Sequence, residues 1–368
     1  MVHRQELKSQ EDGEGSAIAD FSMEALHKNG IVVAEVLQDR LMWLENFWLW
    51  ATFLGDPKSV FCMFFPVAYF LNQKVGVAVL WIALISEWLN LVFKWFLFGE
   101  RPYWWMHESG ALSKYGLIVR QFPSTCETGP GSPSGHCMIT GAALWPVLIA
   151  SSKYLWQRSQ SRLVWLVTIK LYFVFMLAVG LSRVFILAHF PHQVLAGIVA
   201  GIVLGHVLSR NIPDEKEFRF YVIASTVLLV GASFLYWSMI GIGIDPSWSI
   251  RFASKWCSNP KWVRLDTMPF SSVTRCAGNA LGLGLTVHSP LYREVKQQIF
   301  KGRDCVRCMG LSVALLHTLD YIPLPTSFNM LFYILNFMKN AVYPLIVIAI
   351  VPGVMKSLNR GESTPKCE

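Results

Sequence analysis

The sequence predicts an all-α fold, a polytopic membrane helix bundle with about nine transmembrane helices. The first observation is composition: 53% of the 368 residues are hydrophobic and 15% are charged, against about a quarter in soluble domains. The second is that apolar runs of about 20 residues, the length that crosses the hydrocarbon core of a bilayer, recur along the chain. The third is that positive residues gather in the loops after alternate runs, as in the cytosolic loops of membrane proteins.

The N-terminal region precedes the first of these apolar runs. Residues 1–20 are polar and partly acidic, and we expect them to form a disordered tail, without the features of a cleaved signal peptide. The following segment becomes amphipathic and ends in WLENFWLW, a composition typical of a membrane surface. We expect one transmembrane domain over residues 21–355 and a short cytosolic tail at 356–368.

Nine apolar segments are candidate transmembrane helices. The seventh is short and glycine-rich, which makes it the weakest candidate. The segments lie at about 58–74, 76–98, 134–153, 163–182, 187–208, 219–243, 276–291, 306–322 and 328–352.

The loops after the first, third, fifth and seventh segments hold most of the positive charge and indicate the cytosolic face. The N-terminus and the remaining loops are then lumenal, and the C-terminus is cytosolic. The positive residues of the cytosolic loops are Lys74; Lys153, Arg158 and Arg162; Arg210, Lys216 and Arg219; and Arg293, Lys296, Lys301, Arg303 and Arg307.

Charge and cysteine content exclude some functions. The net charge of +8 has this topological explanation, and no nucleic-acid-binding motif accompanies it. Cys305 and Cys308 form a C-x-x-C, but no second pair of ligands follows at zinc spacing, so no metal is predicted. Four other cysteines fall near the lumenal side, where a disulfide can form: Cys126, Cys137, Cys257 and Cys276.

Groups suited to binding an oxyanion fall at the lumenal ends of the predicted helices. Lys94, Arg101 and Arg183 are three cations, and an Arg guanidinium matches phosphate oxygens bidentately. Ser134 and Gly135 begin the third helix, where free N–H groups and the helix dipole favour an anion. These residues predict a pocket for a tetrahedral oxyanion that needs neither a metal nor another cofactor.

Two histidines at the same boundary supply the remaining chemistry. His136 follows Gly135 directly, and His189 begins the fifth segment. One imidazole can attack phosphorus while the other protonates the departing oxygen. The residue types therefore predict phosphoryl transfer through a covalent intermediate.

Three spaced motifs carry a family resemblance. Lys94 with Arg101-Pro102, the sequence PSGH at 133–136, and Ser182-Arg183 with His189 resemble the signature of the type-2 phosphatidic acid phosphatase and vanadium haloperoxidase superfamily. The longer stretches LNLVFKWFLFGERPYWW, CETGPGSPSGH and GLSRVFILAHFPHQVLAG resemble the glucose-6-phosphatase catalytic subunit family. The stretches WLENFWLWATFLGDPK, HESG and HCMITGAALWP, together with the lack of an N-x-S/T sequon, resemble its ubiquitously expressed third paralogue most. The resemblance covers roughly residues 30–355.

This resemblance implies a nine-span enzyme of the endoplasmic reticulum membrane, with a type-2 phosphatidic acid phosphatase-like core and a lumenal site. It implies hydrolysis of glucose 6-phosphate, or of a related sugar phosphate such as 1,5-anhydroglucitol 6-phosphate, without a cofactor. His189 is then the nucleophile and His136 the proton donor. The phosphate-binding residues are Lys94, Arg101, Ser134, Gly135 and Arg183. The implied surroundings are endoplasmic reticulum lipids and a glucose-6-phosphate transporter as functional partner.

Residues around the motifs are predicted less directly. Many superfamily members have an aspartate four residues after the nucleophilic histidine, where this chain has Gln193. We expect Gln193 or Asp56 to orient His189. Glu87 shares a helical face with Lys94 and is expected to pair inside the bundle or to restrain Lys94. The loop at 247–266 is expected to cover the site or to contact a partner.

Three alternatives remain open. A lipid phosphate phosphatase or phosphotransferase of the same superfamily would usually have six spans and an entry from the lipid. A haloperoxidase would need vanadate and is usually soluble. An inactive anion-binding transporter or scaffold belongs to another class, and the intact pair of histidines argues against it.

Overall fold

The computed structural model describes residues 23–213, 215–264, 267–325 and 328–362. All nine predicted apolar segments are helical, and the one strand-type feature among the described residues is an isolated bridge between Glu127 and Arg264. The tail predicted at residues 1–20 lies outside the described residues. Of the tail predicted at 356–368, residues 356–362 continue a helix and the rest lies outside the described part.

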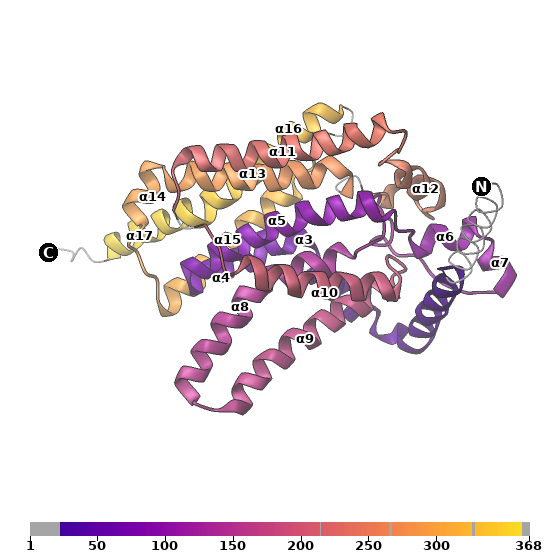
Figure 1. The fold of residues 1–368 in the computed structure, drawn as a ribbon. Helices are drawn as coiled ribbons and strands as arrows, with labels where there is room; N and C mark the ends of the chain where they lie inside the picture. Colours follow the sequence, from indigo (N-terminus) through magenta and orange to yellow (C-terminus); the bar gives the residue numbers. More distant parts are fainter. Residues whose placement is uncertain (1–22, 214, 265–266, 326–327, 363–368) are drawn as a thin grey trace, which may run out of the picture.

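The N-terminal half begins with a helix over residues 23–41 and ends with a pair of helices that lead away from the site region (Figure 1). Its further elements are η1 (Met42–Leu44), α2 (Glu45–Gly55), α3 (Pro57–Ser59), the π-helical η2 (Val60–Phe64), α4 (Phe65–Leu71), α5 (Gln73–Leu97), α6 (Pro102–Glu108), α7 (Ala111–Tyr115), α8 (Gly135–Ser159) and α9 (Arg162–Phe185).

The C-terminal half returns along the bundle, and α17 lies at the end opposite to residues 23–41 (Figure 1). Its elements are α10 (Pro191–Leu208), α11 (Phe218–Gly241), α12 (Trp248–Trp256), η3 (Pro260–Trp262), α13 (Pro269–Val287), α14 (Pro290–Val295), α15 (Gly302–Tyr321), α16 (Asn329–Leu345), the π-helical η5 (Ile346–Ile350) and α17 (Val351–Glu362).

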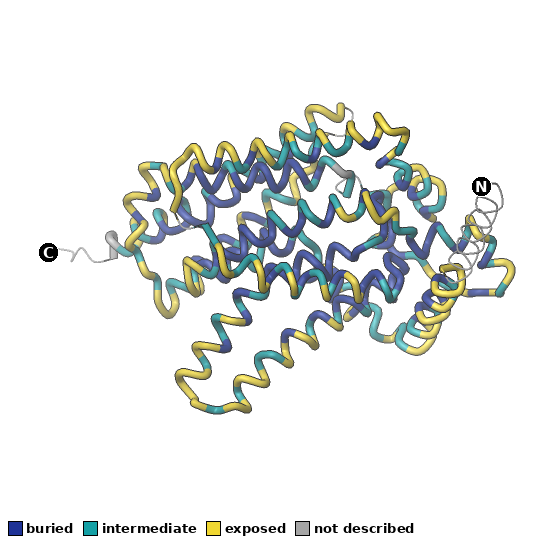
Figure 2. The backbone as a smooth tube through the Cα atoms, viewed as in Figure 1, coloured by how far each residue is buried: buried dark blue, intermediate teal, exposed yellow. Residues whose placement is uncertain are grey.

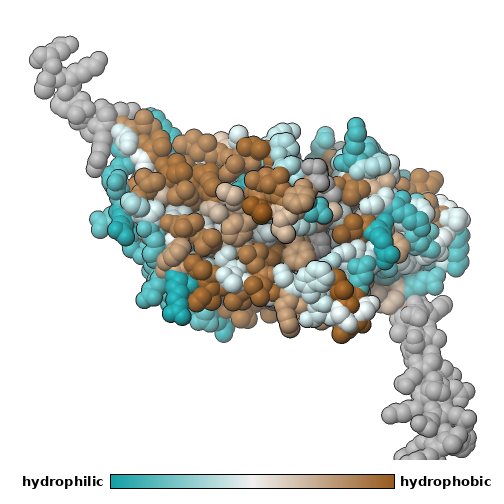
Figure 3. Space-filling view, turned by 90° about the horizontal axis from the view of Figure 1, so that it is seen from above, coloured by the Kyte–Doolittle hydropathy of each residue, from teal (hydrophilic) through white to brown (hydrophobic). Residues whose placement is uncertain are grey.

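Within the described part of the chain, six helical stretches are long and apolar enough to cross a membrane. Apolar side chains form a broad belt across the middle of the molecule, and polar side chains gather at both ends (Figure 3). The chain is therefore a multi-pass membrane protein by its helix composition. The six stretches are Gln73–Glu108, Gly135–Ser159, Arg162–Phe185, Pro191–Leu208, Phe218–Gly241 and Asn329–Asn359.

The first, seventh and eighth predicted spans do not meet this standard. The helix at Pro57–Leu71 is apolar but short. Helix α13 is polar because it is interior: Asn336 of α16 donates to the Ser271 carbonyl (2.9 Å) and to the Thr274 hydroxyl (2.8 Å). Polar groups at membrane depth are tolerated when they bond to neighbouring helices in this way.

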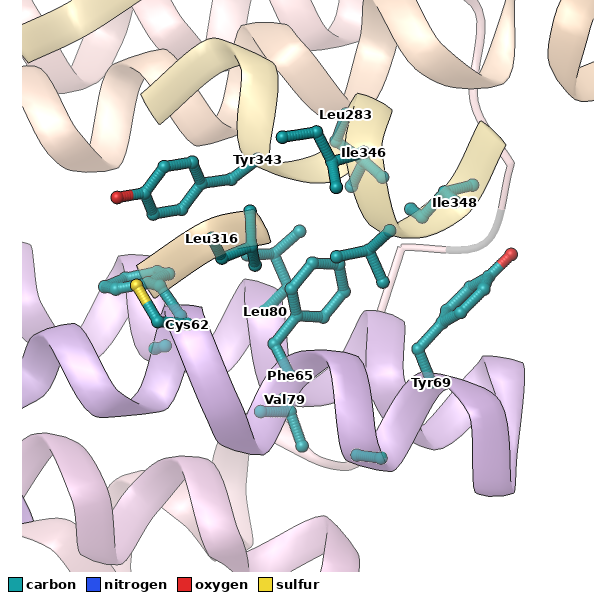
Figure 4. Packing of buried hydrophobic residues seen from close by; sticks show 14 of the residues in the cluster. Cys62, Phe65, Tyr69, Val79, Leu80, Leu283, Leu316, Tyr343, Ile346 and Ile348 are labelled. Carbon is teal, nitrogen blue, oxygen red and sulfur yellow. The ribbon is translucent and has the colours of Figure 1, made fainter. Parts of the chain in front are cut away.

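Helix α5 is the central helix of the bundle. Of its most apolar 18 residues, 67% are buried inside the protein. The corresponding share for α11 is 17%, because α11 faces outward (Figure 2). Away from the site, η2, α4, α5, α13, α15, α16 and η5 share one apolar cluster, in which Phe65 and Leu80 are buried (Figure 4). The first half of α5 is therefore packed in this apolar cluster, and the polar residues Glu87, Asn90 and Lys94 lie in its second half.

Helix α10 packs along α8 through small residues. A Cβ added at Gly201 would lie 2.7 Å from the Met138 carbonyl oxygen, and one at Gly197 would lie 2.7 Å from the Ser134 carbonyl oxygen. Small residues allow helix backbones to approach closely in membranes. The glycines thereby hold the start of α8 against the start of α10, where the predicted site lies.

Replacing Gly201 by Ala should lower the free energy of unfolding by about 1–3 kcal/mol, because the new methyl group overpacks the contact with α8. Gly310→Ala is the matched control, since a Cβ there meets no heavy atom within 4 Å in an exposed part of α15. That change should be neutral or stabilise by about 0.5 kcal/mol. Thermal unfolding of the detergent-solubilised protein measures both. Equal unfolding temperatures for the two variants would contradict the packing account.

Candidate active site

The structure brings the three separated motifs to one end of the bundle. They come from the end of α5, the turn before α8, the end of α9 and the turn before α10. The arginines and histidines of the motifs are almost completely buried. Lys94, Gly135 and His136 line a cavity there. Buried at the same end, but not among the lining residues, are Arg101, Ser134, Arg183 and His189.

The side chain of Arg101 forms hydrogen bonds with both the turn before α8 and the turn before α10. Its Nε donates to the Gly129 carbonyl (2.7 Å), and its Nη2 donates to the Pro130 carbonyl (3.2 Å). Its Nη1 donates to the Ala188 carbonyl (2.9 Å) and lies 3.4 Å from Nε2 of His189. The guanidinium is fully buried, so these bonds fix the two turns relative to each other.

Glu127 is the counter-charge of both buried arginines. Its Oε2 lies 2.9 Å from Nη2 of Arg101, and its Oε1 accepts a hydrogen bond from Nη2 of Arg183. Burial alone would raise the pKa of the Glu127 carboxyl, but Arg183 and Arg101 outweigh burial and hold that pKa well below its usual range. The carboxylate therefore stays ionised between the two guanidiniums.

The motifs did not identify Glu127, although the sequence contains a signal for it. Glu127 is the one acidic residue between Glu108 and Asp214. Two arginines predicted at buried positions need a counter-charge, because an unpaired buried charge is costly. Charge balance would thus have pointed to Glu127.

His189 is oriented by a backbone carbonyl. Its Nδ1 lies 2.7 Å from the Gly131 carbonyl oxygen, which assigns the proton to Nδ1 and leaves Nε2 unprotonated, facing Nη1 of Arg101. Gly131 is held in turn, because its N–H donates to the Gly99 carbonyl (2.6 Å). A Cβ on Gly131 would lie 2.3 Å from the Glu100 carbonyl oxygen, so only glycine fits there.

The expected orienting roles of Gln193 and Asp56 are therefore wrong. The Gln193 amide donates to the Glu100 carbonyl (2.6 Å) and accepts from the Phe190 N–H (3.2 Å), so it braces the turn rather than the imidazole. Asp56 approaches the other histidine, His136. A carbonyl oxygen in place of a carboxylate orients His189 without adding negative charge.

The start of α8 differs from the prediction in one detail. The backbone N–H of Ser134 donates to the Gln193 carbonyl (3.1 Å), so it is not available to an anion as expected. The Ser134 hydroxyl makes no capping bond to its own helix. At Gly135 a Cβ would lie 2.9 Å from Oδ1 of Asn90, so glycine is also required for packing.

His136 lies between two carboxylates. Its Nδ1 is 3.8 Å from Oε1 of Glu127, and its Nε2 is 3.8 Å from Oδ2 of Asp56. Among the described residues, Nε2 of His136 and Nε of Arg183 are buried without a hydrogen-bond partner. Buried polar atoms are normally satisfied, so these two nitrogens indicate a missing polar ligand.

Lys94 faces the same cavity, one turn of α5 beyond Asn90. Lys94 makes no hydrogen bond or ion pair with any residue that the structure describes. Glu87, which was expected to pair inside the bundle or to restrain Lys94, receives two donors from Arg275 (Nε 3.0 Å, Nη2 2.6 Å). The pairing role is confirmed, and the ammonium of Lys94 remains available to an anion.

The loop at residues 247–266 after α11, expected to cover the site or to contact a partner, contributes one described residue to the cavity. Arg264 of this loop lines the cavity, and a disulfide joins Cys257 to Cys126, next to Glu127. Of the four candidate cysteines, Cys137 and Cys276 are free and buried. No cluster of three or more His, Cys, Asp or Glu placed to hold a metal ion occurs within the described ranges.

Replacing Glu127 by Gln should lower the free energy of unfolding by about 3–5 kcal/mol, because Arg101 and Arg183 lose their buried counter-charge. Added orthophosphate should stabilise the variant more than the unmodified protein, since its charge replaces the lost carboxylate. Thermal unfolding with and without orthophosphate measures both effects.

The control for that change is Glu108→Gln. Glu108 forms a solvent-exposed ion pair with Lys255, so its loss should change the stability little. Equal stability of the two variants would show that Glu127 is not a buried counter-charge.

The pH dependence of stability should report His189. Burial, then Arg101 and Arg183, lower the pKa of His189 well below its usual 6.5. The unfolded chain therefore binds the proton first, and stability falls as the pH drops below about 6.5, by up to about 1.4 kcal/mol per pH unit. Unfolding temperatures between pH 7.5 and 5 should fall less steeply in His189→Gln. Parallel curves for the two proteins would exclude this contribution.

Comparisons with known proteins agree with this geometry. Residues 75–217 match the PAP2 superfamily, and no solved structure matches the chain. The chain is 53% identical over 343 residues to glucose-6-phosphatase 3 of Bos taurus, which covers 93% of this chain and 99% of that protein. It is 51% identical to glucose-6-phosphatase 3 of Homo sapiens over the same shares.

A more distant relative extends the same picture. Over 344 residues the chain is 36% identical to glucose-6-phosphatase catalytic subunit 1 of Canis lupus familiaris, covering 90% of this chain and 95% of that protein. With motifs, site geometry and near full-length similarity in agreement, the chain belongs to the glucose-6-phosphatase family of the PAP2 superfamily.

Proposed function

We propose that this chain hydrolyses glucose 6-phosphate to glucose and phosphate through a phosphohistidine intermediate. The relatives are named glucose-6-phosphatases, and the site supports the same reaction here. The observation that carries the proposal is the convergence of polar groups that lack partners among the described residues. Lys94 and His136 line one cavity with Glu127. Glu127 bonds to Arg183, whose Nε, like Nε2 of His136, has no hydrogen-bond partner in the described part of the chain. A phosphate monoester supplies the oxygens that these groups need.

The first half of the reaction uses both histidines. Nε2 of neutral His189 attacks phosphorus as the bond from phosphorus to the sugar O6 breaks, and O6 takes the proton from Nε2 of His136. The Gly131 carbonyl accepts from Nδ1 of His189 and so stabilises the imidazole as it gains positive charge. Free sugar leaves, and the phosphoryl group stays on His189.

The second half restores the enzyme. His136 has given up its proton at Nε2, so this nitrogen takes a proton from water as that water attacks phosphorus and the bond to His189 breaks. Lys94 and Arg183 bind the phosphoryl oxygens in both steps and match the charge of the transition state. Arg101 contributes Nη1, which lies beside Nε2 of His189 and turns to the phosphoryl group when Nε2 is bonded to phosphorus. Ser134 adds its hydroxyl, and Gly135 allows close approach to the start of α8.

We further propose the location of the protein. Nine spans within one domain over 21–355 would put the site in the lumen of the endoplasmic reticulum and the C-terminus in the cytosol. The disulfide between Cys126 and Cys257, beside the site, supports an oxidising compartment. Residues 23–41 and α17 lie at opposite ends of the molecule, which supports an odd number of spans between them. The membrane lipids of that compartment would surround the apolar belt.

Substrate must then enter the lumen, so a glucose-6-phosphate transporter is the functional partner that we propose. Related polyol 6-phosphates, such as 1,5-anhydroglucitol 6-phosphate, present the same primary phosphate to the site. A substrate panel on the purified enzyme ranks these compounds.

Replacement of His189 by Ala should abolish the phosphoenzyme and reduce kcat by at least about a thousandfold, because no other group can carry the phosphoryl group. Acid quenching with ³²P-labelled glucose 6-phosphate traps the intermediate in the unmodified enzyme. His192→Ala is the neighbouring control: His192 stacks on Phe190 and His27, and its loss should leave a labelled enzyme of similar turnover. Hydrolysis at the unmodified rate by the His189 variant would disprove the mechanism.

A further inference from the structure

The cavity lined by Lys94, Gly135 and His136 has a second side, beyond the motif residues. This side is lined from three segments outside the motifs: the start of α3, the loop after η3 and the start of α13. Most of the side chains there are charged or hydroxylated. Those nearest the argument are Asp56, Lys58, Arg264, Thr267 and Ser272.

The two nitrogens of His136 fix the direction of the leaving group. Nδ1 faces Glu127, which is bound to the arginines, and Nε2 faces Asp56. Because Nε2 is the nitrogen that gives its proton to the departing oxygen, that oxygen lies beside Nε2. The carbon skeleton attached to the oxygen then extends toward Asp56 and away from Arg101 and Arg183.

Asp56 and Arg264 form a fixed polar pair at that position. Oδ1 of Asp56 accepts from the Lys58 N–H at the start of α3 (2.9 Å), and Oδ2 accepts from Nη2 of Arg264 (3.0 Å). Asp56 and Arg264 both line the cavity, and their side chains keep 16% and 22% of their surface exposed.

The backbone of Arg264 is anchored to the phosphate end. Its N–H donates to the Cys126 carbonyl (3.0 Å). The disulfide between Cys126 and Cys257 joins the same two loops, the one before α8 and the one after α12. The Thr267 hydroxyl donates to the Arg264 carbonyl (2.7 Å). The pair is therefore held at a constant distance from the phosphate site.

We infer that Asp56 and Arg264 form the subsite that binds the hydroxyl groups of the leaving sugar, Asp56 as acceptor and Arg264 as donor. This inference rests on the proposed phosphatase function and adds its specificity: the site selects phosphate esters of polyhydroxylated rings. A carboxylate beside a guanidinium matches adjacent hydroxyls, each of which both donates and accepts. An acyl chain in this region would strip water from charged groups without replacing it, so lipid phosphates are excluded.

The test compares two substrates with the same primary alkoxide leaving group. Glucose 6-phosphate carries ring hydroxyls, and cyclohexylmethyl phosphate carries none, while both need the same proton from His136. In Asp56→Asn and in Arg264→Gln of the full-length detergent-solubilised enzyme, kcat/KM for glucose 6-phosphate should fall by about tenfold to a hundredfold. The kcat/KM for cyclohexylmethyl phosphate should stay within about threefold of the unmodified value.

Asp245→Asn is the matched control. Asp245 also accepts from the backbone N–H two residues later (Ser247, 2.9 Å) but is exposed and outside the cavity, so its substrate ratio should not change. A parallel fall of kcat/KM for both substrates in the Asp56 and Arg264 variants overturns the inference, because the pair would then act only through His136. An unmodified enzyme that hydrolyses neither compound overturns the proposed function instead.

Discussion

The carboxylate of Glu127, shared by the guanidiniums of Arg101 and Arg183, is the interaction on which the rest of the site depends. The two arginines come from opposite sides of the turn before α8, one after α5 and one at the end of α9. Both are fully buried, so neither could remain charged there without an anion. Glu127 joins these segments and leaves Nε of Arg183 without a hydrogen-bond partner among the described residues. One acidic residue thereby makes a doubly cationic pocket compatible with a buried location.

The remainder of the fold keeps these segments in register. The apolar cluster at the far end of α5 fixes the bundle, while the glycines of α10 let the start of α8 approach the turn that holds His189. The contact of Ser134 with the Gln193 carbonyl joins the two helix starts directly. Helices thus carry Lys94, His136 and Arg183, while the turns between them carry Arg101 and His189 and supply backbone carbonyls that orient side chains.

The sequence predicted the helices and the motif residues well for physical reasons. Long apolar segments have few alternatives to a helix in a membrane, and the spacing of Lys94, Arg101, Arg183 and the two histidines placed all of them at one boundary. The hydrogen bonds of the polar face of α13 could not be predicted, because its partner on α16, Asn336, is far away in the sequence. The cysteines were narrowed to four, but only the structure selected the pair Cys126–Cys257.

The supporting residues could not be predicted because their roles depend on contacts between distant segments. Gln193 occupies the position at which many superfamily members have an aspartate, but its amide donates to the Glu100 carbonyl. The Gly131 carbonyl, and not Gln193, accepts from Nδ1 of His189. Asp56 was correctly placed near the site but on the wrong histidine. These assignments need coordinates, since periodicity and spacing describe only which face of one helix a residue shares.

The central claim is that a tetrahedral oxyanion binds between Lys94, the two arginines and the start of α8, next to His189. An experimental structure of the enzyme with orthovanadate tests it most directly. The account predicts vanadium bonded to Nε2 of His189, with vanadate oxygens within hydrogen-bond distance of Lys94 and Arg183, and with Nε2 of His136 facing the apical oxygen. Vanadate bound elsewhere, or bound in this cavity without contact to His189, would contradict it.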